Sequence, residues 1–294
     1  MSHVMARLMG GLGNQMFQYA AGKSLATRLG VSLLLDRTFL DNRSTSAGLT
    51  MRNYELDVFK IDARVAEKGE VKKMRRPIDS KLSRLIPGVF SNHVFRETEK
   101  IFLKEFEDLS APVYLEGFWQ CEKYFLSIAD SLINKDFVPV ETISGLNSEL
   151  LDRINSTSSV GLHVRRNDYV TNLSAAQFHG VCSVDYYERA AKLIVEKAGA
   201  EHCFVFSDEI EWVKANLHLP GTTTYVSYNK GRESYWDMFL MKNCKHHIIA
   251  NSSFSWWGAW LNPSKEKIVI APEKWFVDPA SQRNEIIPVS WIKL

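Results

Sequence analysis

The second half of the chain alternates regularly between short apolar segments and helical segments, and this alternation restricts the possible folds more than any other feature. The predicted strands are residues 159–164, 202–206, 223–227, 247–250 and 267–270. The predicted helices are residues 184–197, 209–216, 233–243 and 254–261. Strands joined by helices form a parallel sheet with helices on both faces. The sequence therefore predicts an α/β fold that binds its ligand at the carboxyl ends of the strands.

The first half opens with the same pattern. A strand at 4–8 runs into the glycine-rich stretch 10–14, and apolar residues at helical spacing predict a helix at 15–29. The other elements predicted here are strands at 31–35 and 113–115 and a helix at 122–132. Residues 37–112 show no clear period. Because Pro139 and Gly145 flank a polar stretch, we expect a linker near 138–145 between two Rossmann-like domains, residues 1–140 and 141–294.

Charge and composition exclude several classes of protein. A net charge of +2 over 294 residues is too small for a general nucleic-acid binder, although it is compatible with a nucleotide diphosphate. The four cysteines form no C-x-x-C pair and match no zinc site, so we expect buried free thiols in a reducing compartment. The sequence shows no signal peptide and no stretch of about 18 apolar residues. These features predict a cytoplasmic protein.

The glycine-rich stretch is a first candidate for ligand binding. Gly11 and Gly13 permit a close approach of the backbone to a ligand, and Asn14 and Gln15 follow at the start of the predicted helix. The spacing is neither G-x-G-x-x-G nor a P-loop. A strand-to-helix turn that simply needs glycine explains the stretch equally well.

Polar residues follow three of the predicted strands in the second half. Arg165 and Arg166 leave the strand 159–164, and alternation sends one toward the ligand while the other pairs with an acid, for which Asp168 is the first choice. The sequence does not decide which arginine faces the ligand. Asp208 and Glu209 follow the next strand, where they can cap a helix or bind guanine or ribose hydroxyls.

Two further groups of residues lie at the same predicted edge. His163 is inside an apolar strand, where a core role and a ligand-binding role are both open. The run at the start of the last predicted helix offers hydroxyls and backbone N–H groups to a phosphate or a sugar; it consists of Asn251, Ser252, Ser253, Phe254 and Ser255. The tryptophans that follow on that helix are expected in the core.

Six segments, taken in order, resemble the bacterial α-1,2-fucosyltransferases of glycosyltransferase family 11. They are GGLGNQMFQYAAGKSLA at 10–26, YLEGFWQCEKYF at 114–125, HVRRNDY at 163–169, FHGVCSVDYY at 178–187, FSDE at 206–209 and NSSFSWWGAWLNP at 251–263. The resemblance implies a GT-B-type fold, in which two Rossmann-like domains face a central cleft. It further implies that residues 1–140 bind the acceptor, and that residues 141–294 bind GDP-fucose as the donor substrate.

The resemblance also assigns roles. Transfer would invert the anomeric carbon without a metal, and no D-x-D motif follows a predicted strand. Arg165 would neutralise the departing GDP, and Asp168 or His179 would take the proton of the acceptor. The motifs and the resemblance together predict a donor site that consists of Gly11, Gly13, Asn14, Gln15, His163, Arg165, Arg166, Asp208, Glu209, Asn251, Ser252, Ser253, Phe254 and Ser255.

The implied acceptor is the 2-hydroxyl of a galactose-terminated oligosaccharide or of a lipid-linked glycan in surface polysaccharide synthesis. The basic stretch 68–84 suggests peripheral contact with the inner membrane face, and a solvated charged helix is the alternative. The H-x-R-R-x-D block also occurs in α-1,6-fucosyltransferases, so another linkage stays open. A non-catalytic carbohydrate-binding protein with the same fold is the remaining alternative.

Overall fold

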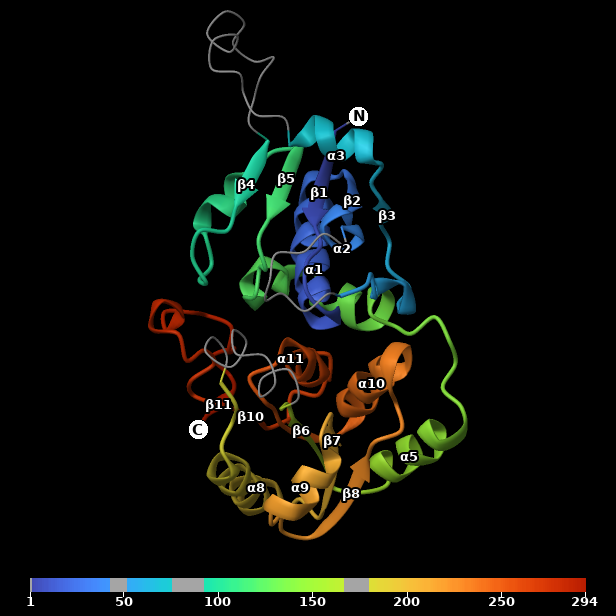
Figure 1. Ribbon diagram of the computed structural model, residues 1–294, viewed down its shortest axis with the longest axis vertical. Coiled ribbons are helices and arrows are strands. Elements are labelled where there is room, and N and C mark those ends of the chain that lie inside the picture. The colour runs from blue at the N-terminus through green and yellow to red at the C-terminus, as the bar shows by residue number, and fades with distance from the viewer. Residues whose placement is uncertain (1, 43–51, 76–92, 167–179) are drawn as a thin grey trace, which may run out of the picture. The chain divides into compact units, whose positions relative to one another are not determined.

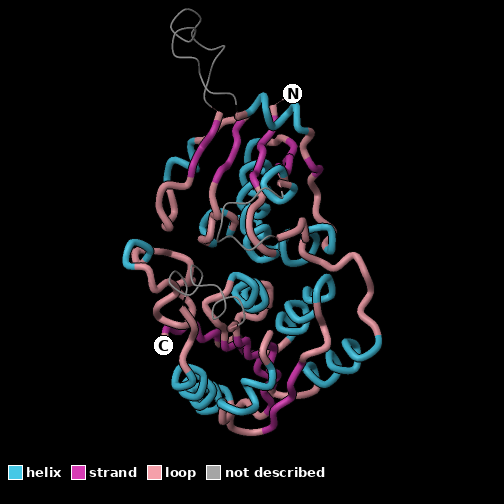
Figure 2. Tube along the Cα trace, viewed as in Figure 1, coloured by secondary structure: helices cyan, strands magenta, loops and turns pink. Residues whose placement is uncertain are grey.

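The computed structural model describes residues 2–42, 52–75, 93–166 and 180–294. The chain divides into two compact units, residues 1–137 and 138–294. Each unit is built on one parallel β-sheet with helices packed against it (Figures 1 and 2). The predicted α/β fold with two Rossmann-like units is therefore confirmed.

The first unit contains a five-stranded sheet with the strand order β3-β2-β1-β5-β4, in which all neighbouring strands are parallel. Its strands are β1 (His3–Arg7), β2 (Ser32–Asp36), β3 (Arg64–Val65), β4 (Val94–Arg96) and β5 (Val113–Glu116). Its helices and helical turns are α1 (Leu12–Leu29), α2 (Thr38–Asp41), η1 (Leu56–Val58), α3 (Lys68–Met74), η2 (Lys104–Asp108), η3 (Glu122–Tyr124), η4 (Leu126–Ile128), α4 (Ala129–Ser131) and η5 (Leu132–Asp136).

Both faces of this sheet are covered, as its apolar strands require. Helix α1 packs on one face, where Gly22 lies against Ala6 of β1 and Leu33 of β2. On the other face, Val71 and Met74 of α3 pack in a cluster of buried residues with Met5, Leu34 and Tyr114. Burial on both faces explains why the three central residues of β1, Val4, Met5 and Ala6, are all apolar rather than alternating with polar residues.

The second unit contains a six-stranded parallel sheet with the order β11-β10-β9-β6-β7-β8. Its strands are β6 (Ser159–Val164), β7 (His202–Ser207), β8 (Thr222–Val226), β9 (His246–Ile248), β10 (Val269–Ala271) and β11 (Ile292–Lys293). Its helices and helical turns are α5 (Gly145–Asn155), α8 (Val184–Ala198), α9 (Ile210–Asn216), η6 (Gly231–Ser234), α10 (Tyr235–Asn243), α11 (Ser253–Trp260) and η7 (Pro279–Ser281).

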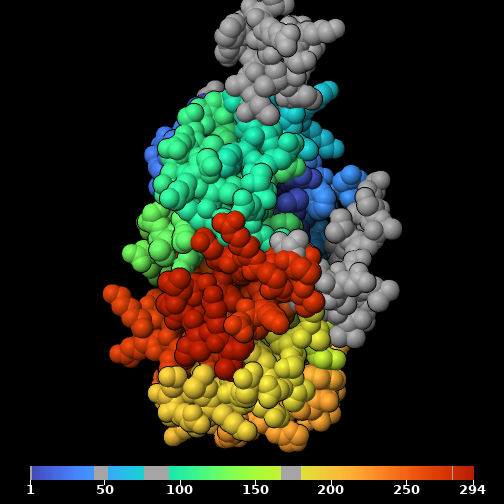
Figure 3. Space-filling view, turned by 90° about the vertical axis from the view of Figure 1, so that its left-hand side faces the viewer, coloured from blue at the N-terminus to red at the C-terminus, as the bar shows by residue number. Residues whose placement is uncertain are grey.

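Two apolar clusters hold the helices of the second unit to its sheet. One joins α8 and α9 to residues of β6 and β7, and the other joins α5 and α10 to Phe204, Phe206 and Val226 (Figure 1). The C-terminal segment, drawn in red, spreads over one side of this unit (Figure 3). Trp256, Trp257 and Trp260 on α11 are buried, which confirms their expected place in the core.

The structure contains elements that the sequence did not predict, among them β3, β4, α5 and β11, and it lacks one helix that the sequence predicted. Strand β11 was not predicted, because two residues with only one apolar side chain give no periodic signal. The helix predicted at 122–132 is wrong, since short turns (η3, η4 and α4) occupy that segment. Phe125 interrupts the helix with a φ of −141°, while the Tyr124 hydroxyl donates to the Ile101 carbonyl and accepts the Leu103 N–H. These contacts from outside the segment override its helical spacing.

The predicted free thiols are present, since none of the four cysteines forms a disulfide, and Cys182 is the one that is only partly buried. Within the described residues, no helix is long and apolar enough to cross a membrane.

Candidate functional site

The carboxyl edge of the second sheet brings most of the predicted site residues together. Strand β6 lies between β9 and β7, so the segments that follow these three strands are neighbours. Arg165 and Arg166 follow β6, Asp208 and Glu209 follow β7, and the run from Asn251 follows β9. Because all three strands are parallel, they end at the same edge.

Asp208 organises the arginine segment. Its Oδ2 lies 3.2 Å from Arg165 Nη1, and its Oδ1 accepts the backbone N–H of Arg166 at 3.0 Å. A single carboxylate thus fixes both the direction of the chain after β6 and the guanidinium of Arg165. The sequence suggested helix capping or guanine binding for this acid and did not identify its contact with the arginines.

The two arginines have different surroundings. Arg166 Nε lies 3.2 Å from Glu209 Oε2, and its guanidinium carbon lies 3.6 Å from the centre of the Trp212 ring. The Arg166 side chain is therefore packed against α9, and this contact with Trp212 was not predicted. Glu209 is the acid partner that the structure shows for Arg166. The expected partner Asp168 lies outside the described residues, and so does His179.

His163 is buried at the same edge, with its ring 5.6 Å from that of Phe254 on α11. Burial, with a smaller contribution from the positive charge of Arg165, lowers the pKa of His163 to about 3. The ring is therefore neutral near pH 7. Its Nδ1 is buried and has no hydrogen-bond partner among the described residues, which is uncommon for a buried polar atom.

The run 251–255 separates into two kinds of residue. Asn251 Nδ2 donates to the carbonyls of Gly180 and Trp275, and the buried Ser255 hydroxyl donates to backbone carbonyls at the start of α11. These two side chains hold the loop in place. Ser252 is at the N-cap position of α11, and within the described part of the chain its side chain does not cap the backbone N–H groups of the first turn.

The glycine loop of the first unit is held by hydrogen bonds to other residues of that unit. Gly10 has a φ of +74°, and a Cβ at this position would lie 2.4 Å from Asn14 Nδ2. Gln15 is fully buried; its Nε2 donates to the carbonyls of Gly10 and Asn53, and its Oε1 accepts the N–H of Glu55. The predicted donor ligand Gln15 is thus engaged in fixing the loop, whereas Asn14 is partly exposed.

The amino end of α1 already has an anionic partner. The Glu55 carboxylate accepts the backbone N–H of Leu12, the first residue of α1. Burial raises the pKa of Glu55, and Arg52 and the Leu12 N–H oppose this change. The sequence interpretation, which offered this helix end to a phosphate or sugar, did not identify Glu55, since it lies in the stretch 37–112 that showed no period.

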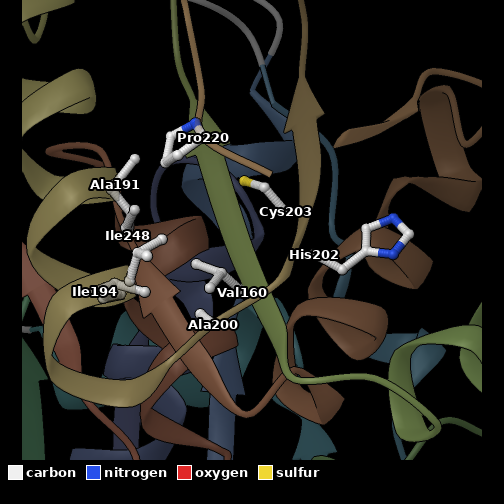
Figure 4. Close-up of a pocket in the computed structure, with 9 residues that line it drawn as sticks. Val160, Ala191, Ile194, Ala200, His202, Cys203, Pro220 and Ile248 are labelled. Carbon is white, nitrogen blue, oxygen red and sulfur yellow. The ribbon is translucent and has the colours of Figure 1, made fainter. Parts of the chain in front are cut away.

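Other parts of the molecule fit a nucleotide less well. Among the described residues, no group of three or more His, Cys, Asp or Glu side chains could hold a metal ion. A pocket lined mainly by apolar side chains, including Val160, Ala191 and Ile194, lies at the start of β6 and β7 (Figure 4). Arg165 follows the opposite end of β6. The His202 ring points away from these side chains in Figure 4 and stacks on Phe204. This pocket offers little to a charged ligand.

Two parallel α/β units with polar residues at the strand ends define a Rossmann-like protein of the kind that binds nucleotides. A sequence model described as "Glycosyl transferase family 11" matches residues 3–294, and the chain therefore belongs to this family of glycosyltransferases. The resemblance drawn from the six segments is confirmed.

Several known proteins are similar to the chain. An "Alpha-1,2-colitosyltransferase" of Escherichia coli is 37% identical over 100% of this chain and 99% of its own length. The "O-antigen biosynthesis glycosyltransferase WbnK" of Escherichia coli is 35% identical over 98% of this chain and 99% of its own. Human "Galactoside alpha-(1,2)-fucosyltransferase 1" is 28% identical over 60% of this chain and 51% of its own. The crystal structure of the fucosyltransferase NodZ from Bradyrhizobium matches 89% of this chain and 94% of its own with 17% identity and a TM-score of 0.49.

Proposed function

We propose that this glycosyltransferase moves L-fucose from GDP-fucose to the 2-hydroxyl of a galactose-type acceptor, with inversion at the anomeric carbon. The observation that carries the proposal is Arg165, which follows β6 at the carboxyl edge of the second sheet, close enough to lower the pKa of a neutral histidine and on the same edge at which α11 begins. The family supports glycosyl transfer. The names of the similar proteins, two of which include α-1,2 transfer, support the linkage.

Arg165 is the better candidate for the diphosphate. Arg166 is engaged by Glu209 and stacked on Trp212, whereas Arg165 is 26% exposed and directed by Asp208. A guanidinium presents parallel N–H donors that match two phosphate oxygens. The amino end of α11 adds N–H groups and a favourable dipole, and Ser252 and Ser253 add hydroxyls. These groups supply positive potential where a metal ion would otherwise be needed.

The proposed reaction is one in-line displacement. The acceptor oxygen forms a bond to C1 of fucose while the bond from C1 to the phosphate oxygen of GDP breaks, and GDP leaves with the electron pair. Negative charge grows on GDP, so Arg165 binds the transition state more strongly than the bound donor. The acceptor hydroxyl gives its proton to a base on the opposite side, and Asp168 or His179 stays the proposed base.

A second donor is favoured by one observation. The 37% identical relative is a colitosyltransferase, and colitose is fucose without its 3-hydroxyl group. The contacts described for the diphosphate serve either sugar. GDP-colitose is therefore the alternative donor for the same site and the same linkage.

We further propose an acceptor of the O-antigen type, because the similar protein WbnK is named as an O-antigen biosynthesis glycosyltransferase. Helix α3 is the described part of the basic stretch for which contact with a membrane, and so with a lipid-linked acceptor, was considered. Its Val71 and Met74 are buried on the sheet, and its Lys68, Lys72 and Lys73 are exposed, whereas residues 76–84 lie outside the described residues. Since the apolar face of α3 is already used, any membrane contact of α3 is electrostatic. Binding to anionic liposomes at low salt, and its loss at high salt, tests this point.

The activity is tested with GDP-fucose and GDP-colitose on an array of acceptors, with release of GDP as the readout. We expect release that depends on a terminal galactose, and a product that an α-1,2-specific fucosidase cleaves. Cleavage only by an α-1,6-specific fucosidase would show that the linkage is α-1,6 and not the proposed α-1,2. Binding of glycans without release of GDP from either donor would indicate a non-catalytic carbohydrate-binding protein.

A further inference from the structure

The segment that follows β5 has an unusual backbone. Trp119 has a φ of +57°, and it is the only residue other than glycine with a positive φ among the described parts of the chain. A bulky side chain in this region is strained and persists where the surroundings impose it. The segment lies at the carboxyl edge of the first sheet, where an α/β unit presents its ligands.

Glu97 imposes this conformation. Its two carboxylate oxygens accept the backbone N–H groups of Phe118 and Trp119 at 2.7 Å and 3.0 Å. A Cβ on Gly117 would lie 2.4 Å from the Glu97 Cβ, so only glycine permits this close approach. The Trp119 ring is fully buried, with the rings of Tyr124 and Phe106 5.3 Å and 5.8 Å away.

The consequence of this arrangement is the placement of Phe118. With Trp119 anchored in the core, the preceding side chain is directed outward, and Phe118 is 40% exposed. On the other side of Trp119, Gln120 Nε2 donates to Asn14 Oδ1 at 2.8 Å and ties the segment to the glycine loop. An exposed phenyl group on a backbone fixed at this many points can contact a ligand with little loss of conformational entropy.

A carboxylate stands two residues before this aromatic residue in the chain. Glu116, the last residue of β5, pairs with Arg7 at the end of β1 and with Arg96 at the end of β4, where its Oε2 lies 2.8 Å from Arg96 Nε. Its side chain is 16% exposed. The two arginines fix the position of the Glu116 carboxylate, and carboxylate oxygens accept hydrogen bonds from sugar hydroxyls.

We propose that Phe118, presented by the segment that Glu97 clamps, is the stacking platform for the terminal galactose-type ring of the acceptor, with Glu116 as an acceptor of hydrogen bonds from its hydroxyls. The C–H groups on one face of a galactopyranose form an apolar surface that packs on an aromatic ring. The proposal rests on the proposed transfer to a galactoside, and it assigns residues of the first unit to the recognition of that acceptor.

The first test compares Phe118→Ala and Phe118→Tyr with the wild type, using lactose as acceptor. We expect the alanine variant to raise KM for lactose about tenfold, the scale of one lost aromatic contact, and to leave KM for the nucleotide sugar unchanged. Tyrosine should restore most of the loss. Leu146→Ala, which removes another exposed apolar side chain, is the matched control. An unchanged KM for lactose in folded Phe118→Ala would overturn the proposal, as would an equal rise for the donor.

Glu97→Gln tests the clamp, because glutamine keeps one acceptor for two N–H groups. Glu97 is a positioning residue, so Glu97→Gln should change the KM for lactose. The KM for the donor and the circular dichroism spectrum should stay unchanged. Saturation-transfer NMR of the full chain with methyl β-galactoside needs no donor and no turnover. If the wild type transfers no sugar but binds this probe through Phe118, the proposed function fails and the platform stands. If the wild type transfers sugar and the probe signal is the same in Phe118→Ala, the platform fails alone.

Discussion

The neutral state of His163 predicts that the protein loses stability in mild acid. The pKa of His163 is lowered from 6.5 to about 3, mainly by burial and further by Arg165. In the unfolded chain the ring regains its ordinary pKa, so the unfolded state binds more protons between about pH 6.5 and pH 3. Stability from this group is therefore fully present above pH 6.5 and is lost as the pH falls toward 3.

The magnitude follows from these two values. At pH 5.0 the solution is 1.5 pH units below 6.5 and still above the folded value. Each unit corresponds to about 1.4 kcal/mol, so His163 alone lowers the free energy of unfolding by about 2 kcal/mol between pH 7.5 and pH 5.0. His163→Leu removes the titrating group, and the variant should lose about 2 kcal/mol less than the wild type over this interval.

The assay is urea unfolding of both proteins at pH 7.5 and pH 5.0, followed by circular dichroism. Leu162→Ala is the matched control, because Leu162 is a buried neighbour on β6 that carries no charge. Its cost should be the same at both pH values. The buried His247, whose pKa is also lowered, contributes equally to all three proteins and cancels in the comparison. If His163→Leu and the wild type show the same pH dependence, the buried neutral histidine is refuted.

Three further results are expected. Arg165→Ala should lower kcat about 100-fold or more, and Arg165→Lys should recover part of this loss. Arg166→Ala leaves Trp212 without its stacked partner and should mainly lower the melting temperature. Steady-state kinetics and thermal melts separate the two effects, and near-normal turnover of folded Arg165→Ala contradicts the assignment. Turnover should survive EDTA, and loss of activity that manganese or magnesium restores would show that a metal takes part. Lys267→Met should lower the free energy of unfolding by about 2 kcal/mol, because Lys267 Nζ donates to the carbonyls of Ala259, Trp260 and Asn262 at the end of α11. An unchanged urea midpoint would show that these hydrogen bonds add nothing to the stability of the protein.

The sequence by itself determined the α/β class, most strands and helices of the second unit, and the family. These features depend on local apolar periodicity and on motifs that are contiguous in the chain. The sequence also placed Arg165, Arg166, Asp208 and the start of α11 at strand ends, because parallel strands that alternate with helices all end at one edge of their sheet. It did not say which side chains meet there.

Only the tertiary structure decided which side chains pair with one another at these sites. Asp208 and Glu209 reach the arginines from a different strand, and Glu55 reaches the amino end of α1 from a stretch without a recognisable period. The positive φ of Trp119 depends on Glu97 and on aromatic neighbours distant in sequence. Periodicity records which face of an element is buried, whereas hydrogen bonds and ion pairs depend on distances between elements that only the packed chain sets.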